Sequence, residues 1–326
     1  TAGSAIAEEP GAPRSAATGA TLLTVPMVAS RYVPARATYS RFGVGAPRPY
    51  SVADYPIADL RAGWYWDWAA RPDAERPLGT EYYPTIRLTQ VGEDGFSFTP
   101  GIETIIEVAA VHPGTVWLIG NEPDRKYWQD DLVPRAYANA YAHLYRLIKD
   151  IDPTAVIGAG QIVQPTALRL QYLEEVLQAY RDAQGAEMPV DVWVIHAYPL
   201  SEDPLDNGAD LPPGIDGGDI FRISLVETTS VAIFQKFIAD FRQWMLDHGY
   251  RDCPLIVSEF GVLAYEDLCP DGVCLFDEEH VIQYMNATLE VLNSQANLET
   301  GYPADHYRLV QKWAWYSLTN SPTTGE

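Results

Sequence analysis

Short apolar runs alternate with stretches of helical periodicity along this chain, from about residue 39 onward. Apolar runs of about four to eight residues between turn signals are typical of buried strands, and their alternation with helices is typical of a parallel sheet. The pattern predicts eight strands, at residues 40–46, 63–68, 83–88, 115–120, 155–160, 190–197, 255–259 and 309–316.

Apolar residues three or four positions apart mark helices between these strands. One face is apolar at Tyr137, Tyr141, Leu144 and Ile148, at Leu170, Leu173, Leu177 and Tyr180, and at Phe234, Phe237, Phe241 and Met245. Thr166, Ser230 and Asp277 stand at N-cap positions. Because no glycine-rich phosphate loop favours an open doubly wound sheet, the pattern predicts an α/β fold, a single (β/α)8 TIM barrel.

The sequence departs from this regular pattern at two places. Residues 69–81 are proline-rich and too short for a full helix. Only about ten residues follow the eighth strand, so the last helix of the barrel is missing or replaced. Either residues 21–38 cover that place or the chain is a piece of something longer. Residues 1–20, rich in Ala, Gly, Pro and Ser, predict a flexible leader before one domain at 21–326.

The beginning of the chain and its hydropathy indicate where in or outside the cell the protein is expected. The chain begins at Thr1 with no hydrophobic signal core, which suggests a processed start, and we expect a secreted or cell-surface monomer. No stretch approaches the ~20 apolar residues of a membrane span.

Composition narrows the class of partner. A formal net charge of -22 disfavours nucleic acid and anionic membrane surfaces, whereas a neutral polymer is compatible with it. Nine tryptophans and twenty tyrosines supply aromatic faces of the kind that stack on sugars, although many will be core. The sequence therefore favours a polysaccharide or oligosaccharide as partner and predicts no cofactor.

The acidic and cysteine-containing segments predict no metal site. Aspartates between residues 201 and 219 lack the spacing of a calcium loop, so we expect a solvated insertion; they are Asp203, Asp206, Asp210, Asp216 and Asp219. Cys269 and Cys274 bracket a Pro-Asp-Gly-Val turn, and the sequence leaves open whether they form a disulfide. Cys253 is predicted to be a buried thiol.

Two predicted strands end in glutamate. Glu122 follows the fourth strand in Gly-Asn-Glu-Pro-Asp, and Glu259 lies at the end of the seventh in Val-Ser-Glu-Phe-Gly. Carboxyl ends of barrel strands carry the catalytic groups, and the fourth and seventh strands lie nearly opposite each other. A pair of carboxyl groups is what glycoside hydrolysis requires, although Asn-Glu-Pro-Asp taken alone is equally compatible with a simple turn.

The residues beside the two glutamates strengthen the catalytic interpretation. A separation of about 5 to 5.5 Å between the carboxyl groups indicates a retaining enzyme, and roughly 6.5 to 9.5 Å an inverting one. We expect Glu122 protonated as the acid/base and Glu259 ionised as the nucleophile. Asn121 is placed to contact a sugar hydroxyl, and His196 and Tyr198, after the sixth strand, to orient a carboxylate.

Aromatic and charged residues near strand ends are candidates for binding sugar. Strand alternation puts Trp313 and Trp315 on one side, and we expect Trp315 to be the stacking floor. Trp68 is a further stacking candidate, and Trp128 a more distant platform. Arg87 is predicted either to pair with a carboxylate in the cleft, to bind substrate, or to form an ordinary salt bridge.

The strand ends together resemble clan A glycoside hydrolases, which carry Asn-Glu after strand four and a nucleophilic Glu after strand seven. The closer likeness is to the alkali-sensitive-linkage-like glycosyl hydrolase catalytic domain, the group that contains glycoside hydrolase family 128. It rests on the order of six motifs, namely Trp-Tyr-Trp-Asp-Trp at 64–68, Tyr-Tyr-Pro at 82–84, Asn-Glu-Pro-Asp at 121–124, His-Ala-Tyr at 196–198, Ser-Glu-Phe-Gly at 258–261 and Trp-Ala-Trp-Tyr at 313–316.

The resemblance implies a retaining β-glycanase domain, with β-1,3-glucan as the substrate known for family 128. It also marks Asp67 as a substrate-binding candidate, because Asp67 stands where the family has Asn. Two other functions remain open at this stage. One is a sugar-binding barrel without turnover, and the other is a cell-wall transglycosylase that uses the same two glutamates.

Overall fold

The computed structural model describes residues 41–203, 208–263 and 276–318. The predicted leader, the segment 21–38, Asp206 and the pair Cys269 and Cys274 lie outside the described residues. Cys253 is a free thiol and is half-buried rather than buried, with Sγ 3.5 Å from the carbonyl oxygen of Val190. No helix of the described ranges has the length and apolar character needed to cross a membrane.

Ten strands form one sheet in the order β3-β2-β1-β10-β9-β8-β7-β6-β4-β5. Their bounds are β1 Phe42–Gly45, β2 Trp64–Trp66, β3 Glu81–Tyr82, β4 Thr85–Val91, β5 Gly95–Thr99, β6 Val116–Ile119, β7 Val156–Ile162, β8 Val192–His196, β9 Leu255–Phe260 and β10 Lys312–Trp315. Each of the eight predicted strands overlaps one of these. All neighbours pair in parallel except β4 and β5.

The sheet is a curled half-barrel in which the order follows the chain. β3 pairs with β2 at one end of the order, and β4 pairs with β6 near the other. Only Tyr83 and Pro84 separate β3 from β4, and the amide of Tyr83 still donates to the carbonyl of Tyr65 at 2.9 Å. The carboxyl ends of the parallel strands therefore meet at one rim of the sheet.

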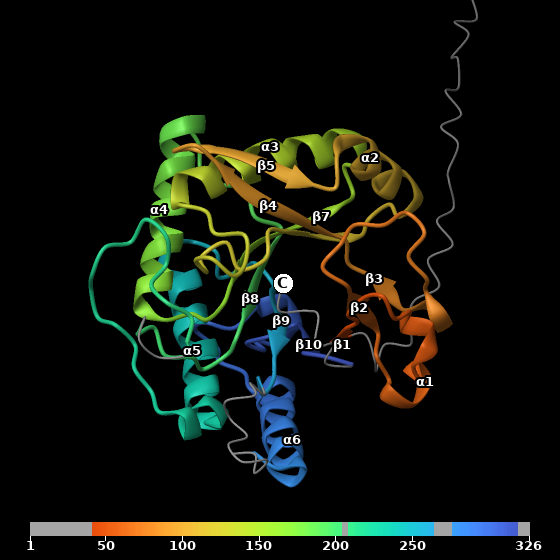
Figure 1. Ribbon diagram of the computed structural model, residues 1–326, viewed down its shortest axis with the longest axis vertical. Coiled ribbons are helices and arrows are strands. Elements are labelled where there is room, and N and C mark those ends of the chain that lie inside the picture. The colour runs from red at the N-terminus through yellow and green to blue at the C-terminus, as the bar shows by residue number, and fades with distance from the viewer. Residues whose placement is uncertain (1–40, 204–207, 264–275, 319–326) are drawn as a thin grey trace, which may run out of the picture. The chain divides into compact units, whose positions relative to one another are not determined.

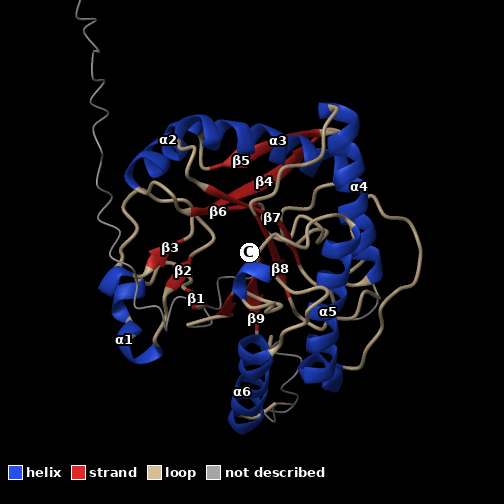
Figure 2. Cartoon of the chain, turned by 180° about the vertical axis from the view of Figure 1, so that it is seen from behind, coloured by secondary structure: helices blue, strands red, loops and turns tan. Residues whose placement is uncertain are grey.

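Helices cover the outer face of this sheet, as Figures 1 and 2 show for the helices between β5 and β10. They are α2 Ile102–Val111, α3 Pro134–Ile151, α4 Ala167–Gln184, α5 Val231–Asp247 and α6 Glu278–Ser294, with the short α1 Ile57–Leu60 between β1 and β2. Ser230 and Asp277 accept the predicted capping hydrogen bonds from their helices. Thr166 precedes α4 but does not cap it, because its hydroxyl donates to Glu202 instead.

Two connections are worth comparing with the sequence pattern. Residues 69–81 hold the 3₁₀ turn Pro77–Gly79 and, at Glu81, the start of β3, but no α-helix, as predicted. The hairpin formed by β4 and β5 was not predicted. Gly92-Glu93-Asp94 makes its turn, and the chain enters α2 only after β5.

Strand alternation divides the core into two layers. Outward residues such as Trp117, Trp193 and Trp313 pack with the helices in the main apolar cluster. A smaller inner cluster includes Trp64, Trp66, Tyr83, Leu118, Val192, Val194, Ile256 and Ala314. Because the inner layer is filled by these side chains, polar groups at the strand ends rest on a packed apolar floor.

Candidate active site

Glu122 lies just beyond the carboxyl end of β6 and is almost completely buried. Its backbone adopts a left-handed conformation with φ of 45°, and its amide donates to the carbonyl of Gln161 at 3.0 Å. Residues other than glycine rarely adopt that backbone conformation without support from their surroundings. The backbone bond to β7 supplies such support and fixes the direction of the carboxyl group.

Glu259 lies in β9 beside a β-bulge. Ile195 of β8 pairs with Val257, but the next residue, His196, pairs with Glu259, so Ser258 is the extra residue. Side chains of a strand alternate between faces, and one inserted residue reverses that alternation. Ile256 belongs to the inner cluster, and the bulge brings Glu259 to the same inner side while Phe260 packs outward.

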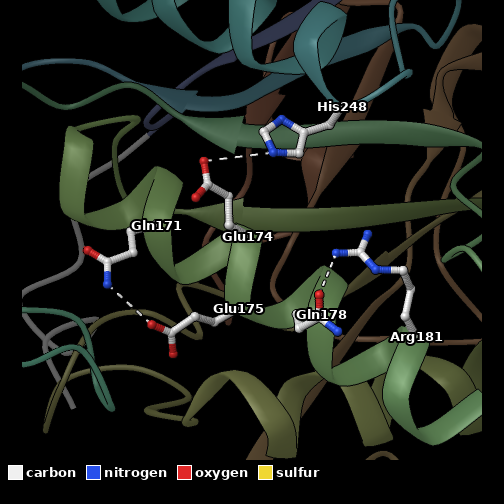
Figure 3. A pocket seen from close by; sticks show the side chains of 6 residues that line it. All are labelled: Gln171, Glu174, Glu175, Gln178, Arg181 and His248. Atoms are coloured by element: carbon white, nitrogen blue, oxygen red, sulfur yellow. Dashed lines mark hydrogen bonds and ion pairs between the residues drawn. The ribbon is translucent and has the colours of Figure 1, made fainter.

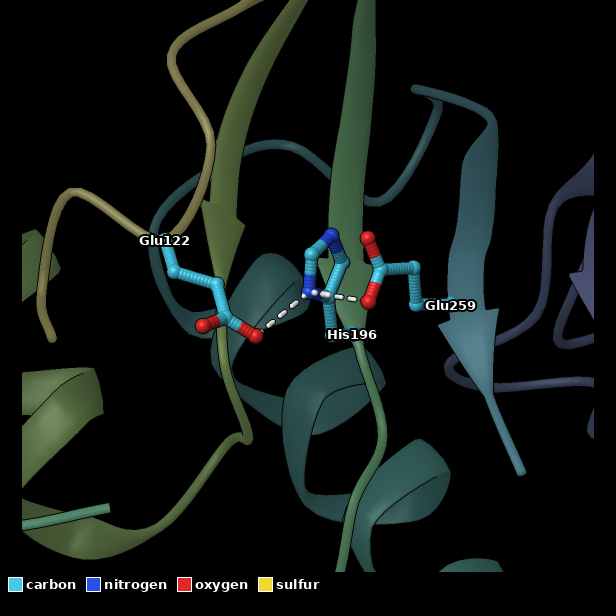
Figure 4. A group of neighbouring side chains, drawn as sticks. All are labelled: Glu122, His196 and Glu259. Carbon is cyan, nitrogen blue, oxygen red and sulfur yellow. Dashed lines mark hydrogen bonds and ion pairs between the residues drawn. The ribbon is translucent and has the colours of Figure 1, made fainter. Parts of the chain in front are cut away.

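His196 joins the two glutamates from the end of β8 (Figure 4). Its Nδ1 is 2.9 Å from Oε1 of Glu122 and 3.5 Å from Oε2 of Glu259. One oxygen of each carboxyl group and one ring nitrogen all lie within 4.8 Å of one another, and all three residues are buried. The three groups are close enough to hold a metal ion, and equally form a carboxyl pair that shares an imidazole proton.

Glu259 receives two hydrogen bonds from aromatic side chains. Nε1 of Trp68 donates to Oε1 at 2.8 Å, and the hydroxyl of Tyr198 donates to Oε2 at 3.0 Å. Tyr316 contacts both donors edge-on, with ring centroids 5.6 Å from Trp68 and 6.2 Å from Tyr198. Three aromatic rings thus surround one carboxyl group, and two of them donate to it.

The charges around the pair act differently on the two glutamates. Burial raises the pKa of Glu122, but Arg125, whose Nη1 donates to Oε2 at 3.1 Å, and His196 outweigh burial and lower that pKa to about 2. Burial raises the pKa of Glu259, the Glu122 carboxylate adds to the rise, and His196 and the two aromatic donors oppose it. These directions favour an ionised Glu122, whereas the sequence led us to expect a protonated one.

The electrostatics favour a proton on the imidazole of His196. Burial lowers the pKa of His196, but the carboxylates of Glu259 and Glu122 outweigh burial, and the pKa is raised. An imidazolium between two carboxyl groups can give its Nδ1 proton to either neighbour. Sequence reasoning placed His196 correctly beside the carboxyl groups but missed Arg125, which comes three residues after Glu122 and pairs with it.

Asn121 and Arg87 belong to a network beside Glu122. Nδ2 of Asn121 donates to Oε1 of Gln129 at 2.9 Å, and that oxygen also accepts from Arg87 at 3.0 Å. Nε of Arg87 donates to Asp130 at 2.6 Å. Arg87 therefore forms the salt bridge that was one of its predicted roles, and its carboxylate partner is Asp130 rather than either glutamate. Oδ1 of Asn121 is buried with no hydrogen-bond partner among the described residues.

The structure places two predicted sugar-binding residues away from the carboxyl pair. Asp67, which follows β2, accepts from Tyr82 at 2.8 Å and from Arg71 at 2.7 Å, and Tyr82 packs in a cluster separate from that of Trp66. Trp315 points outward and packs edge-on against Phe260 with centroids 5.3 Å apart. Strand alternation brings its neighbour Tyr316 to the inner side instead. Trp128, by contrast, is exposed in the loop that follows Glu122.

A buried ionic network fixes the chain behind Glu122. Arg169 of α4 lies between Asp124, at 2.8 Å, and Glu202, at 3.2 Å, and all three are inaccessible to solvent. Arg169 also donates to the carbonyls of Ala209 and Asp210. The acidic insertion predicted to be solvated is therefore tied to the core at its beginning and in its middle.

A polar hollow on the outer surface is separate from these groups. It is lined by Gln171, Glu174, Glu175, Gln178, Arg181 and His248, from α4 and the end of α5 (Figure 3). Nε2 of His248 lies 3.7 Å from Glu174 there. Neither Glu122 nor Glu259 lines this hollow.

Comparison with known proteins adds a family and a fold. Residues 43–208 match the family model described as glycosyl hydrolase catalytic core. No curated protein matches the chain. A glucosidase from Croceicoccus marinus is similar in fold, with a TM-score of 0.54 and 12% identity over 85% of this chain and 60% of that one.

Two further solved structures share the fold. A monomeric β-xylosidase from Caulobacter crescentus CB15 has a TM-score of 0.54 and 14% identity, covering 86% of this chain and 60% of that one. A bifunctional glucanase-xylanase from a metagenome library has a TM-score of 0.50 and 11% identity, covering 87% of this chain and 74% of its own. The chain thus spans about three-fifths of the length of the glucosidase and the xylosidase.

Proposed function

Because this chain belongs to the glycosyl hydrolase catalytic core family, we propose that it is a secreted glycosidase that hydrolyses a β-linked glycan, β-1,3-glucan in particular, with retention of configuration. The domain we propose is a clan A (β/α)8 barrel, in which β3 and β4 together fill one strand position. The observation that carries the catalytic proposal is the buried pair Glu122 and Glu259, bridged by His196.

Double displacement assigns a role to each glutamate. Glu259 attacks the anomeric carbon while Glu122 gives a proton to the departing glycosidic oxygen, leaving a glycosyl ester on Glu259. Glu122 then takes a proton from water, whose oxygen attacks the anomeric carbon and releases the ester. Retention is supported by the closeness of the two groups, with one oxygen of each within 4.8 Å of the other, because the carboxyl groups of retaining enzymes lie nearer together than those of inverting ones, about 5 to 5.5 Å against about 6.5 to 9.5 Å.

Hydrogen bonding supports Glu259 as the nucleophile. Donors to a carboxylate stabilise its ionised form, and Glu259 receives two, from Trp68 and Tyr198. Glu122 becomes the acid when the Nδ1 proton of His196 crosses the 2.9 Å hydrogen bond to Oε1. Binding a neutral sugar over the pair excludes water and disfavours the separated charges on Glu122 and His196, so it favours this transfer.

The configuration of the first-formed product tests the mechanism. Proton NMR of a β-glucan digest should show the β-anomer of the new reducing end before mutarotation. Glu259→Gln should lose turnover by at least about 10³-fold, and azide should rescue Glu259→Ala with an α-glycosyl azide product. Glu175→Gln, an exposed position on α4, is the matched control and should keep full activity. An α-anomer formed first would contradict retention.

A further inference from the structure

Two aromatic side chains stand exposed in the loop that follows Glu122. Tyr127 is 84% exposed and Trp128 is 63% exposed. Large aromatic side chains usually bury most of their surface, and exposed apolar patches often mark binding sites. Neither ring contributes to the core, so packing of the fold does not account for their presence at this place.

The loop is fastened beside the catalytic pair at both ends. Before the rings, Arg125 donates to the carboxyl group of Glu122 at 3.1 Å. After them, Gln129 accepts from the side chain of Asn121 at 2.9 Å, and Asp130 accepts from the amide of Asn121 at 2.7 Å. The segment between these anchors is therefore held next to the acid.

The rings lie within reach of a glycan bound at the pair. Trp128 is three residues from Arg125, so the chain between them spans at most about 11 Å. A sugar presents apolar faces to an aromatic ring and hydroxyls to its polar rim, and Tyr and Trp combine a flat apolar surface with a polar end. The acid protonates the departing oxygen, so its loop borders the side of the leaving sugar.

We propose that Tyr127 and Trp128 form a sugar-binding platform on the leaving-group side of the carboxyl pair, for a β-linked pyranose unit beyond the cleaved bond. This inference rests on the proposed function and specifies its substrate class. A platform at that position selects oligosaccharides and polymers over glycosides with a small leaving group. The enzyme then acts within chains rather than on short aryl glycosides.

Paired substrates test the platform. The variants are Tyr127→Ala, Trp128→Ala and the double variant, with Leu298→Ala as control because Leu298 is 76% exposed, between α6 and β10. The substrates are a β-1,3-linked glucan hexasaccharide and an aryl β-glucoside without a sugar on the leaving side. We expect Trp128→Ala to lower kcat/KM at least about 10-fold for the hexasaccharide, and less than about 3-fold for the aryl glucoside.

Several outcomes separate this inference from the proposed function. Equal losses on both substrates, or no loss on the hexasaccharide, would overturn the platform while leaving hydrolysis intact. If the unaltered protein hydrolyses no glycan, the proposed function fails, and the platform is then tested by binding alone. In that case calorimetric titration with the hexasaccharide should give a Kd at least about 10-fold weaker for Trp128→Ala, and an unchanged Kd overturns the platform.

Discussion

The contact between Arg125 and Glu122 makes a specific prediction about pH. Arg125→Gln removes the positive charge but keeps a side chain able to donate to Oε2 of Glu122, which now accepts at 3.1 Å. The guanidinium favours the ionised carboxylate and disfavours every proton held by Glu122, His196 and Glu259. Removing it therefore raises the affinity of the cluster for its shared proton.

The size of the effect follows from the geometry. Two unit charges about 4 Å apart interact by about 4 kcal/mol at an effective dielectric constant of ~20, which equals about 3 pKa units. The side chains of Arg125 and Glu122 are only 14% and 3% exposed, so water screens them weakly. Since His196 shares the proton, the measured change belongs to the cluster, and we expect about 1 to 3 units.

The assay is the pH dependence of kcat/KM, which reports ionisations of the free enzyme. Under the proposed mechanism, activity is lost on the alkaline side when the cluster gives up the proton that Glu122 would deliver. Arg125→Gln should move that alkaline limb to higher pH, whereas Arg125→Lys should leave it near its original position. Arg181→Gln, a surface control at an exposed ion pair, should not move it. An alkaline limb that stays in place or moves to lower pH would refute the reasoning.

Three further predictions concern other contacts. Tyr198→Phe removes the 3.0 Å donor to Glu259, and we expect kcat to fall about 10²-fold. The acid limb of the pH profile should move to higher pH, because this donor lowers the pKa of Glu259. Arg169→Met leaves Asp124 buried without its cation and should lower the free energy of unfolding in urea by about 3 to 5 kcal/mol. In Gly43→Ala the new methyl carbon would clash with the buried ring of Trp64, and we expect about 1 to 3 kcal/mol of destabilisation by the same titration.

Periodicity predicted most of the sheet and its helices. Apolar runs marked every parallel strand except the two-residue β3, because strands buried on both faces are nearly continuous apolar segments. The β4–β5 hairpin was not predicted, because no helical stretch separates β5, Gly95–Thr99, from the strand before it. The break between β3 and β4 at Tyr83 and Pro84 was not predicted either, because it depends on the pairing of β3 with β2 and of β4 with β6.

The order of motifs along the chain predicted which strand ends carry the site residues, but the sequence did not predict toward which face their side chains point. Simple alternation from Ile256 would turn Glu259 outward, and only the bulge at Ser258 turns it inward. Alternation related Trp315 to Trp313 correctly but did not say which face was inner. The ionisation of Glu122 could not be predicted either, since the i,i+3 contact with Arg125 depends on the path of the loop.

The left-handed backbone at the rim sets a limit on how this protein can be stabilised. Trp68, Glu122 and Gln161, at the ends of three strands, have φ values of 56°, 45° and 49°. Glycine would relax each of them, by about 1 to 2 kcal/mol per position. At Glu122 the strain of the backbone opposes the contacts with Arg125 and His196, which glycine would remove. If the proposed function holds, a library built to raise thermal stability needs Glu122 held constant, and glycine at that position in a relative would predict loss of hydrolysis.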